Sequence, residues 1–282
     1  MNQLKPLQIR EHRFNWGEKT YLMGILNVTP DSFSDGGQFN NLESALTQAQ
    51  QMIAQGADLI DIGGQSTRPG AEEITLDQEL NRVIPVIKQL RQITSIPISI
   101  DTTRAAVAQV AITAGADLVN DISGGTFDRE MFATVAQLNV PIILMHLRGT
   151  PKTMQQLTDY QDLLGEMSRF LDNQIDKAIA AGISHTQIII DPGIGFAKTY
   201  AQNIKILQNL SQFQTLNVPI LVGVSRKSFI GHILNQKNPQ ARVWGTATAC
   251  CAAIAQGADI LRVHDVAEMY DVCRVADQIW RN

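Results

Sequence analysis

The chain has 282 residues, 44% of them hydrophobic but only 6% aromatic, a balance that suits an aliphatic core of the kind found in parallel sheets covered by helices. A formal net charge of −4 provides no chain-wide basic surface for nucleic acid, and no stretch approaches the ~18 apolar residues of a membrane span. The first residues lack the apolar run of a signal peptide, and Cys250, Cys251 and Cys273 lack metal-type spacing, so we expect a cytoplasmic protein with reduced thiols that binds neither nucleic acid nor membranes.

Residues 6–20 come first and indicate a short β-hairpin around Asn15, Trp16 and Gly17 that closes the bottom of the fold. Eight short apolar runs follow it along the chain. Each is rich in Ile, Val and Leu without polar alternation, which is typical of strands buried on both faces. The runs are YLMGILN (21–27), GADLIDIGG (56–64), IPISIDT (96–102), GADLVNDISGG (115–125), VPIILMH (140–146), QIIIDPG (187–193), VPILVGVS (218–225) and GADILRVHD (257–265).

Helical patterns separate these runs. Strand–helix alternation at this spacing predicts parallel strands with helical crossovers. Eight such units favour a (β/α)8 TIM barrel, an α/β fold formed as a single domain over residues 1–282 with the N-terminal hairpin in residues 1–20. An open doubly wound sheet is the alternative. The expected helices cover 42–55, 75–92 (with Pro85 as a local kink), 103–114, 128–138, 159–181, 200–210, 241–256 and 265–280.

Every predicted strand ends in a polar or ionisable residue. An aspartate after a strand is often only a helix N-cap, which is the expectation for Asp121 and Asp128, but eight such ends in eight strands are harder to explain as caps. In a barrel they converge on the carboxyl-terminal rim, where active sites lie. The strand ends are Asn27, Asp61, Asp101, Asn120 with Asp121, His146, Asp191, Ser225, and Arg262 with His264.

Two rim loops, 28–37 and 63–73, are long and rich in Gly, Ser, Thr and Pro. They are either ordinary connections or mobile lids that close over a substrate. Arg68 lies among small residues in the second loop and is placed to bind an anion. Because the loops after strands seven and eight usually bind phosphate in barrels, Asn27, Arg68, Arg262 and His264 could surround a phosphate or pyrophosphate. Arg226 is expected to be a surface charge.

A second group of strand ends suits a flat, nitrogen-rich ligand. The carboxylates Asp101 and Asp191, with Asn120 between them, could accept hydrogen bonds from adjacent N–H groups of a heterocycle, as a carboxylate does from a guanidinium. Lys227 could donate to a ring carbonyl or ring nitrogen. A pair of acid/base carboxylates is the competing interpretation. The chain has no HExxH or GxSxG motif, and Gly193 and Gly195 lack the third glycine of a dinucleotide-binding turn.

Eight motifs lie along the strand–helix units: MGILNVTPDSFSDGG (23–37), DIGGQSTRPGA (61–71), SIDTTR (99–104), VNDISGG (119–125), MHLRGTP (145–151), DPGIGFAKT (191–199), GVSRKS (223–228) and RVHDV (262–266). Together they resemble the dihydropteroate synthase family. The resemblance touches all eight units, and its first, second and seventh motifs are highly specific. One departure is Gln65, which stands where the family commonly has Glu.

The resemblance implies condensation of 6-hydroxymethyl-7,8-dihydropterin pyrophosphate with p-aminobenzoate, the folate-biosynthesis step that sulfonamides target, in a homodimer. Pyrophosphate leaves first and the amine then attacks a pterin-stabilised cation. The implied pterin residues are Asp101, Asn120, Met145, Asp191, Phe196, Gly223 and Lys227. The implied pyrophosphate residues are Asn27, Arg68, Arg262 and His264, with Mg²⁺ at Asn27. Phe33, Thr67, Pro69 and Ser228 would contact p-aminobenzoate, and the catalytic residues would be Asp31, Asp35, Arg68 and Lys227.

Two alternatives stay open at this point. A pterin-binding barrel of the methyltetrahydrofolate methyltransferase type would share the pterin pocket but need no pyrophosphate site, so Arg68 and His264 argue against it. A non-catalytic paralogue that acts as a binding protein is the second, and Gln65 leaves it open.

Overall fold

The computed structural model describes residues 4–29, 38–68 and 70–281. Eight parallel strands form one sheet in the order β8-β7-β6-β5-β4-β3-β10-β9, and a bridge between Ile190 and Ile220 joins its two ends into a barrel. The open-sheet alternative is therefore wrong, and the predicted (β/α)8 fold is confirmed. The strands are β3 (Tyr21–Asn27), β4 (Leu59–Gly63), β5 (Ile98–Asp101), β6 (Leu118–Asp121), β7 (Ile142–Met145), β8 (Ile188–Asp191), β9 (Leu221–Val222) and β10 (Ile260–Val263).

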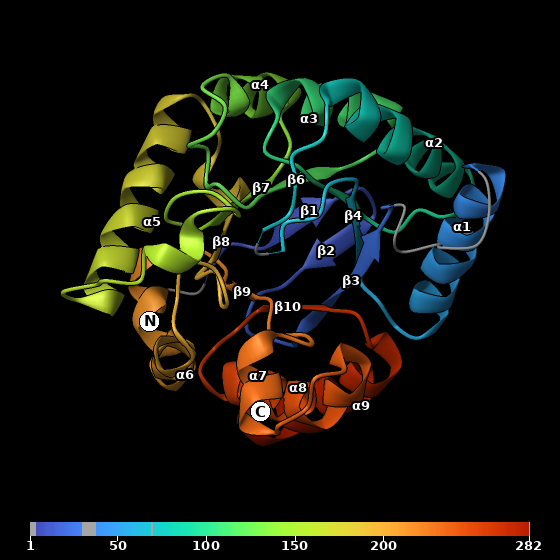
Figure 1. Ribbon diagram of the computed structural model, residues 1–282. Coiled ribbons are helices and arrows are strands. Elements are labelled where there is room, and N and C mark those ends of the chain that lie inside the picture. The colour runs from blue at the N-terminus through green and yellow to red at the C-terminus, as the bar shows by residue number, and fades with distance from the viewer. Residues whose placement is uncertain (1–3, 30–37, 69, 282) are drawn as a thin grey trace.

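Helices surround the barrel and cover its outer face (Figure 1). They are α1 (Gln38–Ala54), α2 (Leu76–Ile93), α3 (Ala105–Ala114), α4 (Met131–Leu138), α5 (Leu163–Ala180), α6 (Tyr200–Gln208), α7 (Ser228–Ile233), α8 (Val243–Ala255) and α9 (Val266–Trp280). Short 3₁₀ turns lie at Met154–Gln156, His185–Gln187, Leu210–Leu216 and Pro239–Arg242. Among the described residues, no helix is both long and apolar enough to cross a membrane.

Local capping explains where several helices begin. Thr75 and Thr199 each form a capping box with the glutamine three residues later, which satisfies two orphan backbone donors at the start of α2 and α6. Asp128 was expected to cap the helix that follows it, but the N-cap residue of α4 is Glu130. Asp128 Oδ2 accepts the backbone N–H of Ala105, 2.8 Å away, so it caps α3 from a neighbouring loop. Asp121 caps no helix either, and accepts hydrogen bonds within its own turn from Ser123 and Gly125.

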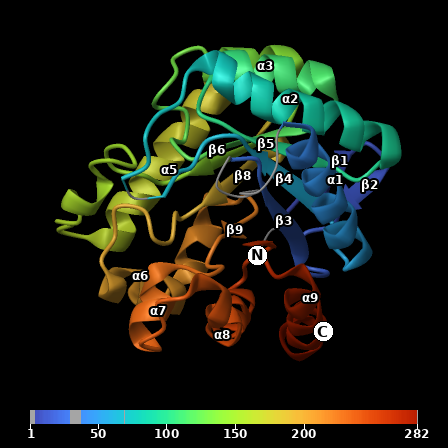
Figure 2. The same cartoon turned by 45° about the vertical axis from the view of Figure 1, so that its right-hand side comes forward.

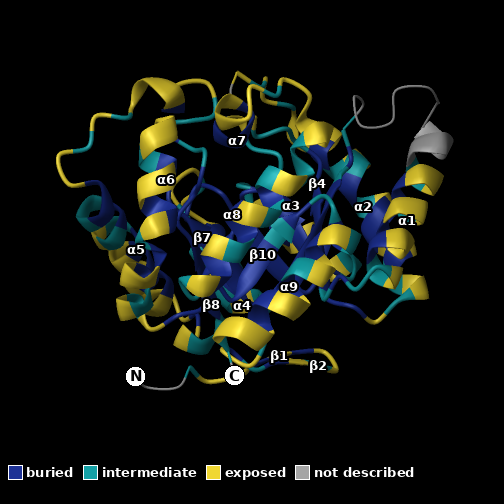
Figure 3. Ribbon diagram, turned by 90° about the horizontal axis from the view of Figure 1, so that it is seen from below, coloured by how far each residue is buried: buried dark blue, intermediate teal, exposed yellow. Residues whose placement is uncertain are grey.

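The N-terminal hairpin closes the bottom of the barrel (Figure 3). Its strands are β1 (Leu7–Ile9) and β2 (His12–Phe14), so the tight turn lies at Arg10 and Glu11 and not around Asn15–Gly17, where the sequence indicated it. Arg10 adopts a positive φ of 52° there. The predicted role is confirmed, because one apolar cluster joins the hairpin and the residues after it to the lowest interior residues of the barrel: Leu7, Ile9, Phe14, Trp16, Tyr21, Met23, Leu59, Leu118, Ile143, Ile189, Leu221 and Ile260.

The repeated Gly-Ala-Asp segments have a common structural role. The aspartates Asp58, Asp117 and Asp259 lie just before β4, β6 and β10, and each accepts a backbone N–H from a neighbouring strand segment. The acceptor oxygens lie 2.8 Å from the amide nitrogen of Leu22, 2.8 Å from that of Ile98 and 3.0 Å from that of Ile220, respectively. These carboxylates thus fasten the amino-terminal ends of adjacent strands to one another.

The barrel interior changes from apolar to polar along the strands. Side chains that point inward on alternate strands form layers of four. On β4, β6, β8 and β10 the lower layer is Leu59, Leu118, Ile189 and Ile260, all at most 1% exposed. Two residues further along each of these strands the layer is Asp61, Asn120, Asp191 and Arg262. This second set, called the polar layer below, faces the carboxyl-terminal rim and forms the floor of the candidate site.

Candidate active site

The polar layer is held together by direct contacts across the barrel. Asp61 lies at its centre, because its Oδ2 accepts hydrogen bonds from Asn120 Nδ2 at 3.0 Å and from Arg262 Nε at 2.6 Å. Arg262 also donates from Nη2 to Asp101 Oδ2 on the adjacent strand β5, at 2.8 Å. Three predicted site residues, Asp101, Asn120 and Arg262, therefore form one connected network with Asp61.

Burial perturbs the two carboxylates that the sequence assigned to a heterocycle. Burial raises the pKa of Asp101 to about 7, opposed by the positive charge of Arg262 and aided by the neighbouring charge of Asp61. Burial likewise raises the pKa of Asp191, with Lys227 acting in the opposite direction. Both carboxylates are buried at the floor of the rim, where a donor-rich ligand would stabilise their charged forms.

Lys227 lies above this floor, at the start of α7. Its ammonium group donates to the carbonyl of Ile194 and lies 4.5 Å from the centre of the Phe196 ring. Burial lowers the pKa of Lys227 to about 8, against the opposing effect of Asp191. A side chain on Gly195 would meet Lys227 Cδ at 2.9 Å, so glycine at this position leaves room for the lysine. Phe196 and Met145 belong to a small apolar cluster with Ile122 at the side of the site.

The turn that follows β8 is held by side chains that donate hydrogen bonds to its carbonyl groups. Gly193, Gly195 and Ala197 all have positive φ, which turns successive carbonyls in alternating directions. Four consecutive carbonyls of this turn are each bonded by a side chain from another position: Ile194 by Lys227, Gly195 by Gln155, Phe196 by Lys198 and Ala197 by Tyr160. Asp191 and Phe196 are thereby fixed at the two ends of the turn.

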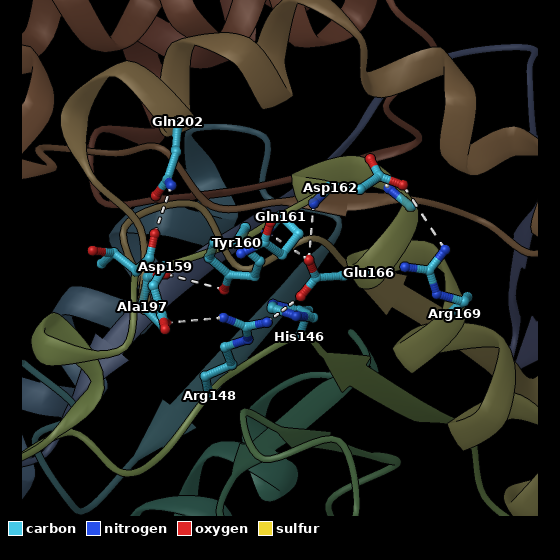
Figure 4. A network of polar contacts seen from close by, with 12 residues as sticks. His146, Arg148, Asp159, Tyr160, Gln161, Asp162, Glu166, Arg169, Ala197 and Gln202 are labelled. Atoms are coloured by element: carbon cyan, nitrogen blue, oxygen red, sulfur yellow. Dashed lines mark hydrogen bonds and ion pairs between the residues drawn. The ribbon is translucent and has the colours of Figure 1, made fainter.

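Tyr160 connects this turn to the long loop after β7. Figure 4 shows Tyr160 beside Arg148, whose guanidinium lies 3.8 Å from the tyrosine ring and pairs with Glu166 of α5. Burial raises the pKa of Tyr160 to about 12, so the hydroxyl stays a donor to Ala197. The loop after β7 thus helps to hold the turn after β8 in place.

His146 lies behind the polar layer and not in the space above it. It is buried against Phe170 and next to Lys198 Nζ, which lies 3.1 Å from its Nδ1. Burial and the charges of Lys198 and Arg148 lower the pKa of His146 to about 2. Burial also lowers the pKa of Lys198, to about 7. The sequence placed His146 at the rim as a strand end, and the structure gives it a supporting position.

Positive charges gather around His264 on the other half of the rim. Its backbone N–H and its Nδ1 both lie near Ser225 Oγ, at 3.1 and 3.0 Å. The pKa of His264 is lowered to about 3, first by burial and then by the cations Arg226, Arg262, Arg68 and Lys227. A neutral histidine among cations is a place where a bound anion would be strongly stabilised.

Arg68 is exposed in the loop 63–73, and Asn27 is half-buried at the end of β3. Gly70 of this loop donates to the carbonyl of Pro151, so the loop leans toward the segment after β7. Arg226 makes two bonds to Asp265 and is therefore an ion-paired residue beside the rim, in place of the free surface charge that the sequence indicated.

A cavity of about 510 Å³ opens beside the floor. It lies between the loop 63–73 and the segments that precede α3 and α4, and Asp101, Ile122 and Thr67 belong to its lining. Gln65, the one visible departure from the family motif, lines the same cavity. Gly223 faces inward at the end of β9, where the missing side chain adds further room. A Cβ there would meet only Arg262 Cβ, at 3.8 Å.

Four of the predicted residues lie outside the described part of the chain: Asp31, Phe33, Asp35 and Pro69. Thr67 lies at the cavity, and Ser228 begins α7 and is exposed beside Lys227. In the described ranges 4–29, 38–68 and 70–281 no group of three or more His, Cys, Asp or Glu could hold a metal ion. A cation at Asn27 would therefore need most of its ligands from substrate and water.

Sequence reasoning did not assign a role to Asp61, Ser225 or Lys198. Asp61 was recognised only as a strand end, although its place between Leu59 and Gly63 puts it on the inward face of β4. The contacts of Ser225 with His264 and of Lys198 with His146 depend on neighbouring strands, so no local pattern indicates them.

Comparison with known proteins agrees with this geometry. The family model described as "Pterin binding enzyme" matches residues 23–264. The chain is 60% identical to the dihydropteroate synthase of Synechocystis over 276 residues, which cover 98% of this chain and 96% of that protein. The Yersinia pestis dihydropteroate synthase, solved with a sulfonamide drug, is 43% identical with a TM-score of 0.92, over 98% of this chain and 99% of that one. The Xanthomonas albilineans enzyme in complex with 7,8-dihydropteroate is 38% identical with a TM-score of 0.88, over 98% of each chain.

Proposed function

This chain belongs to the dihydropteroate synthase family, and we propose that its rim carries out that family's reaction through two adjoining sub-sites. The reaction condenses 6-hydroxymethyl-7,8-dihydropterin pyrophosphate with p-aminobenzoate to give 7,8-dihydropteroate and pyrophosphate. The observation that carries this proposal is the position of the polar layer beneath a cluster of cations around His264.

The first sub-site would hold the pterin. The carboxylates of Asp101 and Asp191 and the amide oxygen of Asn120 accept hydrogen bonds, and a dihydropterin has several N–H donors on one edge. Lys227 would donate to the ring carbonyl or a ring nitrogen. Met145 and Phe196 supply apolar contact, and Gly223 leaves space for the ring. The match of donors to acceptors in a buried place supports this assignment.

The second sub-site would hold the pyrophosphate. The charges of Arg68 and Arg262 act on His264 on that half of the rim, and Asn27, at the end of β3, is proposed with them. As pyrophosphate leaves, negative charge grows on the oxygen that joined its nearer phosphorus to the methylene carbon, and fixed cations stabilise that charge most in a site from which water is excluded. Mg²⁺, bound by Asn27 and by pyrophosphate oxygens, would supply further charge neutralisation.

The amine would attack from the loop side of the site. Thr67 lines the cavity beside the loop 63–73, Ser228 begins α7, and both are proposed for this role with Phe33 and Pro69 from the family motifs. Asp31 and Asp35, in the loop 28–37, would stabilise the methylene cation that forms when pyrophosphate leaves. The proposed chemistry needs no protein nucleophile. The chain binds, orients and keeps water from the cation until the amine attacks.

Purified protein with both substrates and Mg²⁺ tests the proposal. We expect pyrophosphate release that depends on p-aminobenzoate, with 7,8-dihydropteroate formed in equal amount. Release of no pyrophosphate under these conditions, with none after chelation and reloading of the metal, would contradict the proposed function. Binding of methyltetrahydrofolate without turnover would instead favour the methyltransferase-type alternative.

We further propose that the enzyme is a homodimer that associates through its late helices. Figure 2 shows α7, α8 and α9 together along one side of the barrel. Large apolar side chains on these helices are exposed, most of all Trp244 at 76%, with Ile233 at 58% and Ile279 at 60%. A molar mass of about twice 31.0 kDa in light scattering, reduced to one copy by Trp244→Arg, is the expected result. A monomeric native protein would contradict it.

We also assign the enzyme to the cytoplasm. Cys250 and Cys273 are buried free thiols, and burial raises the pKa of both, which keeps them protonated and unreactive. Such thiols suit a reducing compartment.

A further inference from the structure

We propose that Asp61 is a positioning residue that fixes which atoms Asn120 presents to the heterocycle and how Arg262 is oriented beside it. It would thereby determine that the site accepts hydrogen bonds at Asn120, and so which heterocycles fit. This inference rests on the proposed function, because Asn120 belongs to the proposed pterin sub-site and Arg262 to the proposed pyrophosphate sub-site.

Asp61 occupies the centre of the polar layer. It lies on β4, is 0% exposed, and is reached by side chains from both sides of the barrel. Asn120 lies on β6, two strands away in one direction, and Arg262 lies on β10, two strands away in the other. Both donate to the same oxygen, Oδ2. One carboxylate therefore connects two of the proposed ligand-binding side chains, although it is not itself exposed to solvent in either sub-site.

The contact with Asn120 has a direct chemical consequence. An ionised carboxylate only accepts hydrogen bonds, so the Asn120 amide must turn its NH₂ group toward Asp61. Its Oδ1 then points away from Asp61, and no described residue donates to that oxygen. Asn120 is thus held as an acceptor for the ligand. A free asparagine could rotate by half a turn and present a donor instead.

The contact with Arg262 acts in the same way. Its Nε is bound by Asp61 and its Nη2 by Asp101, so two carboxylates from adjacent strands fix the plane of the guanidinium. Among its nitrogens only Nη1 has no contact with a described residue. The side chain is therefore oriented before any ligand binds, which lowers the entropy lost on binding.

The carboxylate is costly to the fold, which argues for a role other than stability. Asp61 Oδ1 is buried and has no hydrogen-bond partner in the described part of the chain. A buried polar atom without a partner typically destabilises a protein, whereas a well-packed apolar residue at the same place is often neutral. Ser99, the register partner of Asp61 on β5, also has a buried and unpartnered hydroxyl. Its hydroxyl makes no hydrogen bond to Asn120 or Arg262, so Ser99→Ala provides a matched control.

A pair of variants separates orientation from charge and folding. In Asp61→Asn the amide oxygen can take the place of Oδ2 and accept from both Asn120 and Arg262, so both side chains stay oriented although the charge is lost. In Asp61→Leu no acceptor remains, and the Asn120 amide is free to turn over.

Steady-state kinetics on the intact enzyme would give the answer. For Asp61→Leu we expect the KM for the pterin pyrophosphate to rise about tenfold or more, the effect of one misplaced buried hydrogen bond, with the KM for p-aminobenzoate unchanged. Asp61→Asn, which keeps the acceptor, should show a much smaller rise, and Ser99→Ala should behave as the native chain. An unchanged pterin KM in a folded Asp61→Leu, or a rise in Asp61→Asn as large as in Asp61→Leu, would overturn the proposal. Turnover by the native chain tests the proposed function separately.

A measurement on the native chain keeps the proposal testable if Asp61→Leu does not fold. Side-chain NH₂ protons of Asn120, identified by their loss in Asn120→Ala, should exchange slowly with deuterium in the unliganded enzyme, because they are bonded to a buried carboxylate. Fast exchange would show that the NH₂ group faces the space above the polar layer, and would overturn the proposal.

Discussion

Aspartates occur at both ends of the same barrel strands, and their surroundings differ. At the amino-terminal ends Asp58, Asp117 and Asp259 each bind a backbone amide of a neighbouring strand and a cation. The cation is Lys19 for the first, Arg91 and Arg10 for the second, and Arg281 for the third. These carboxylates have partners supplied by the fold itself.

At the carboxyl-terminal ends Asp101 and Asp191 lack such complete partners. In the described part of the chain, Asp101 accepts a hydrogen bond from Arg262 through one oxygen, and Asp191 accepts one backbone N–H, from Gly193. Burial raises the pKa of both, as it also raises that of Asp259 at the other end, so the two ends differ in their partners and not in this shift. The same residue type therefore serves the fold at one end of a strand and is left ready for a ligand at the other.

Lys227→Ala should cause the largest loss of activity among the substitutions at the carboxyl-terminal end of the barrel. The variant removes a cation that contacts the turn after β8 and faces the proposed ring, so we expect kcat/KM for the pterin pyrophosphate to fall by about 10²–10³-fold. Thermal stability should not fall, because a buried charge is removed with the side chain. Retention of more than a third of the native kcat/KM would exclude Lys227 from the site.

Arg68→Ala should affect only the pyrophosphate half. We expect kcat/KM for the pyrophosphate substrate to drop by about 10–10²-fold, the loss of one charge-assisted contact. Binding of 6-hydroxymethylpterin, which has no pyrophosphate, should be unchanged in calorimetry. Equal weakening of both ligands would mean that the rim is one undivided site.

Gly223→Ala should narrow the proposed pterin sub-site without disturbing the unliganded fold. The added methyl group meets Arg262 Cβ at 3.8 Å, an ordinary contact, but it occupies space above the polar layer. We expect about a tenfold rise in the KM for the pterin substrate, equivalent to ~1.4 kcal/mol, with the melting temperature unchanged. An unaltered KM would place the ring elsewhere.

The pH dependence of kcat/KM should show two limbs. Burial raises the pKa of Asp101 to about 7, so below that pH the carboxyl is protonated and offers fewer acceptors to the pterin. Burial lowers the pKa of Lys227 to about 8, so above that pH its charge is lost. Activity should therefore be highest between these values. In Lys227→Arg the alkaline limb should move to higher pH, because arginine stays charged, and an unmoved limb would assign it to another group.

Much of the fold is readable in the sequence because it depends on local patterns. The apolar run 21–27 became β3 with the same bounds, and the helical pattern 75–92 became α2. The run 218–225 was too long, since β9 covers Leu221 and Val222 alone and Ile220 adds a single bridge before it. The helix α7 was missed because six residues carry too little periodicity. The turn of the hairpin was misplaced because Arg10 is not a typical turn residue at positive φ.

The sequence predicts which residues lie at the candidate site but not which of them contact one another. That Asp101, Asn120 and Asp191 share one rim follows from strand ends in a barrel. That Asp61 links Asn120 to Arg262 depends on the stagger of strands two positions apart, which no local pattern encodes. The same holds for Asp128, which caps a helix that precedes it in the chain.

The comparison of the two ends is tested most directly by Asp101→Asn and Asp117→Asn, measured side by side for kcat/KM and for melting temperature. Asp101→Asn should lose about 10²-fold or more in kcat/KM for the pterin substrate with no loss of thermal stability, since it removes a buried charge from the proposed site. Asp117→Asn should keep kcat/KM within about threefold while its free energy of unfolding drops by ~3 kcal/mol, because Arg10 and Arg91 lose their charged partner. If Asp117→Asn lost activity as severely as Asp101→Asn while remaining folded, the division between a structural and a functional end of the barrel would be wrong.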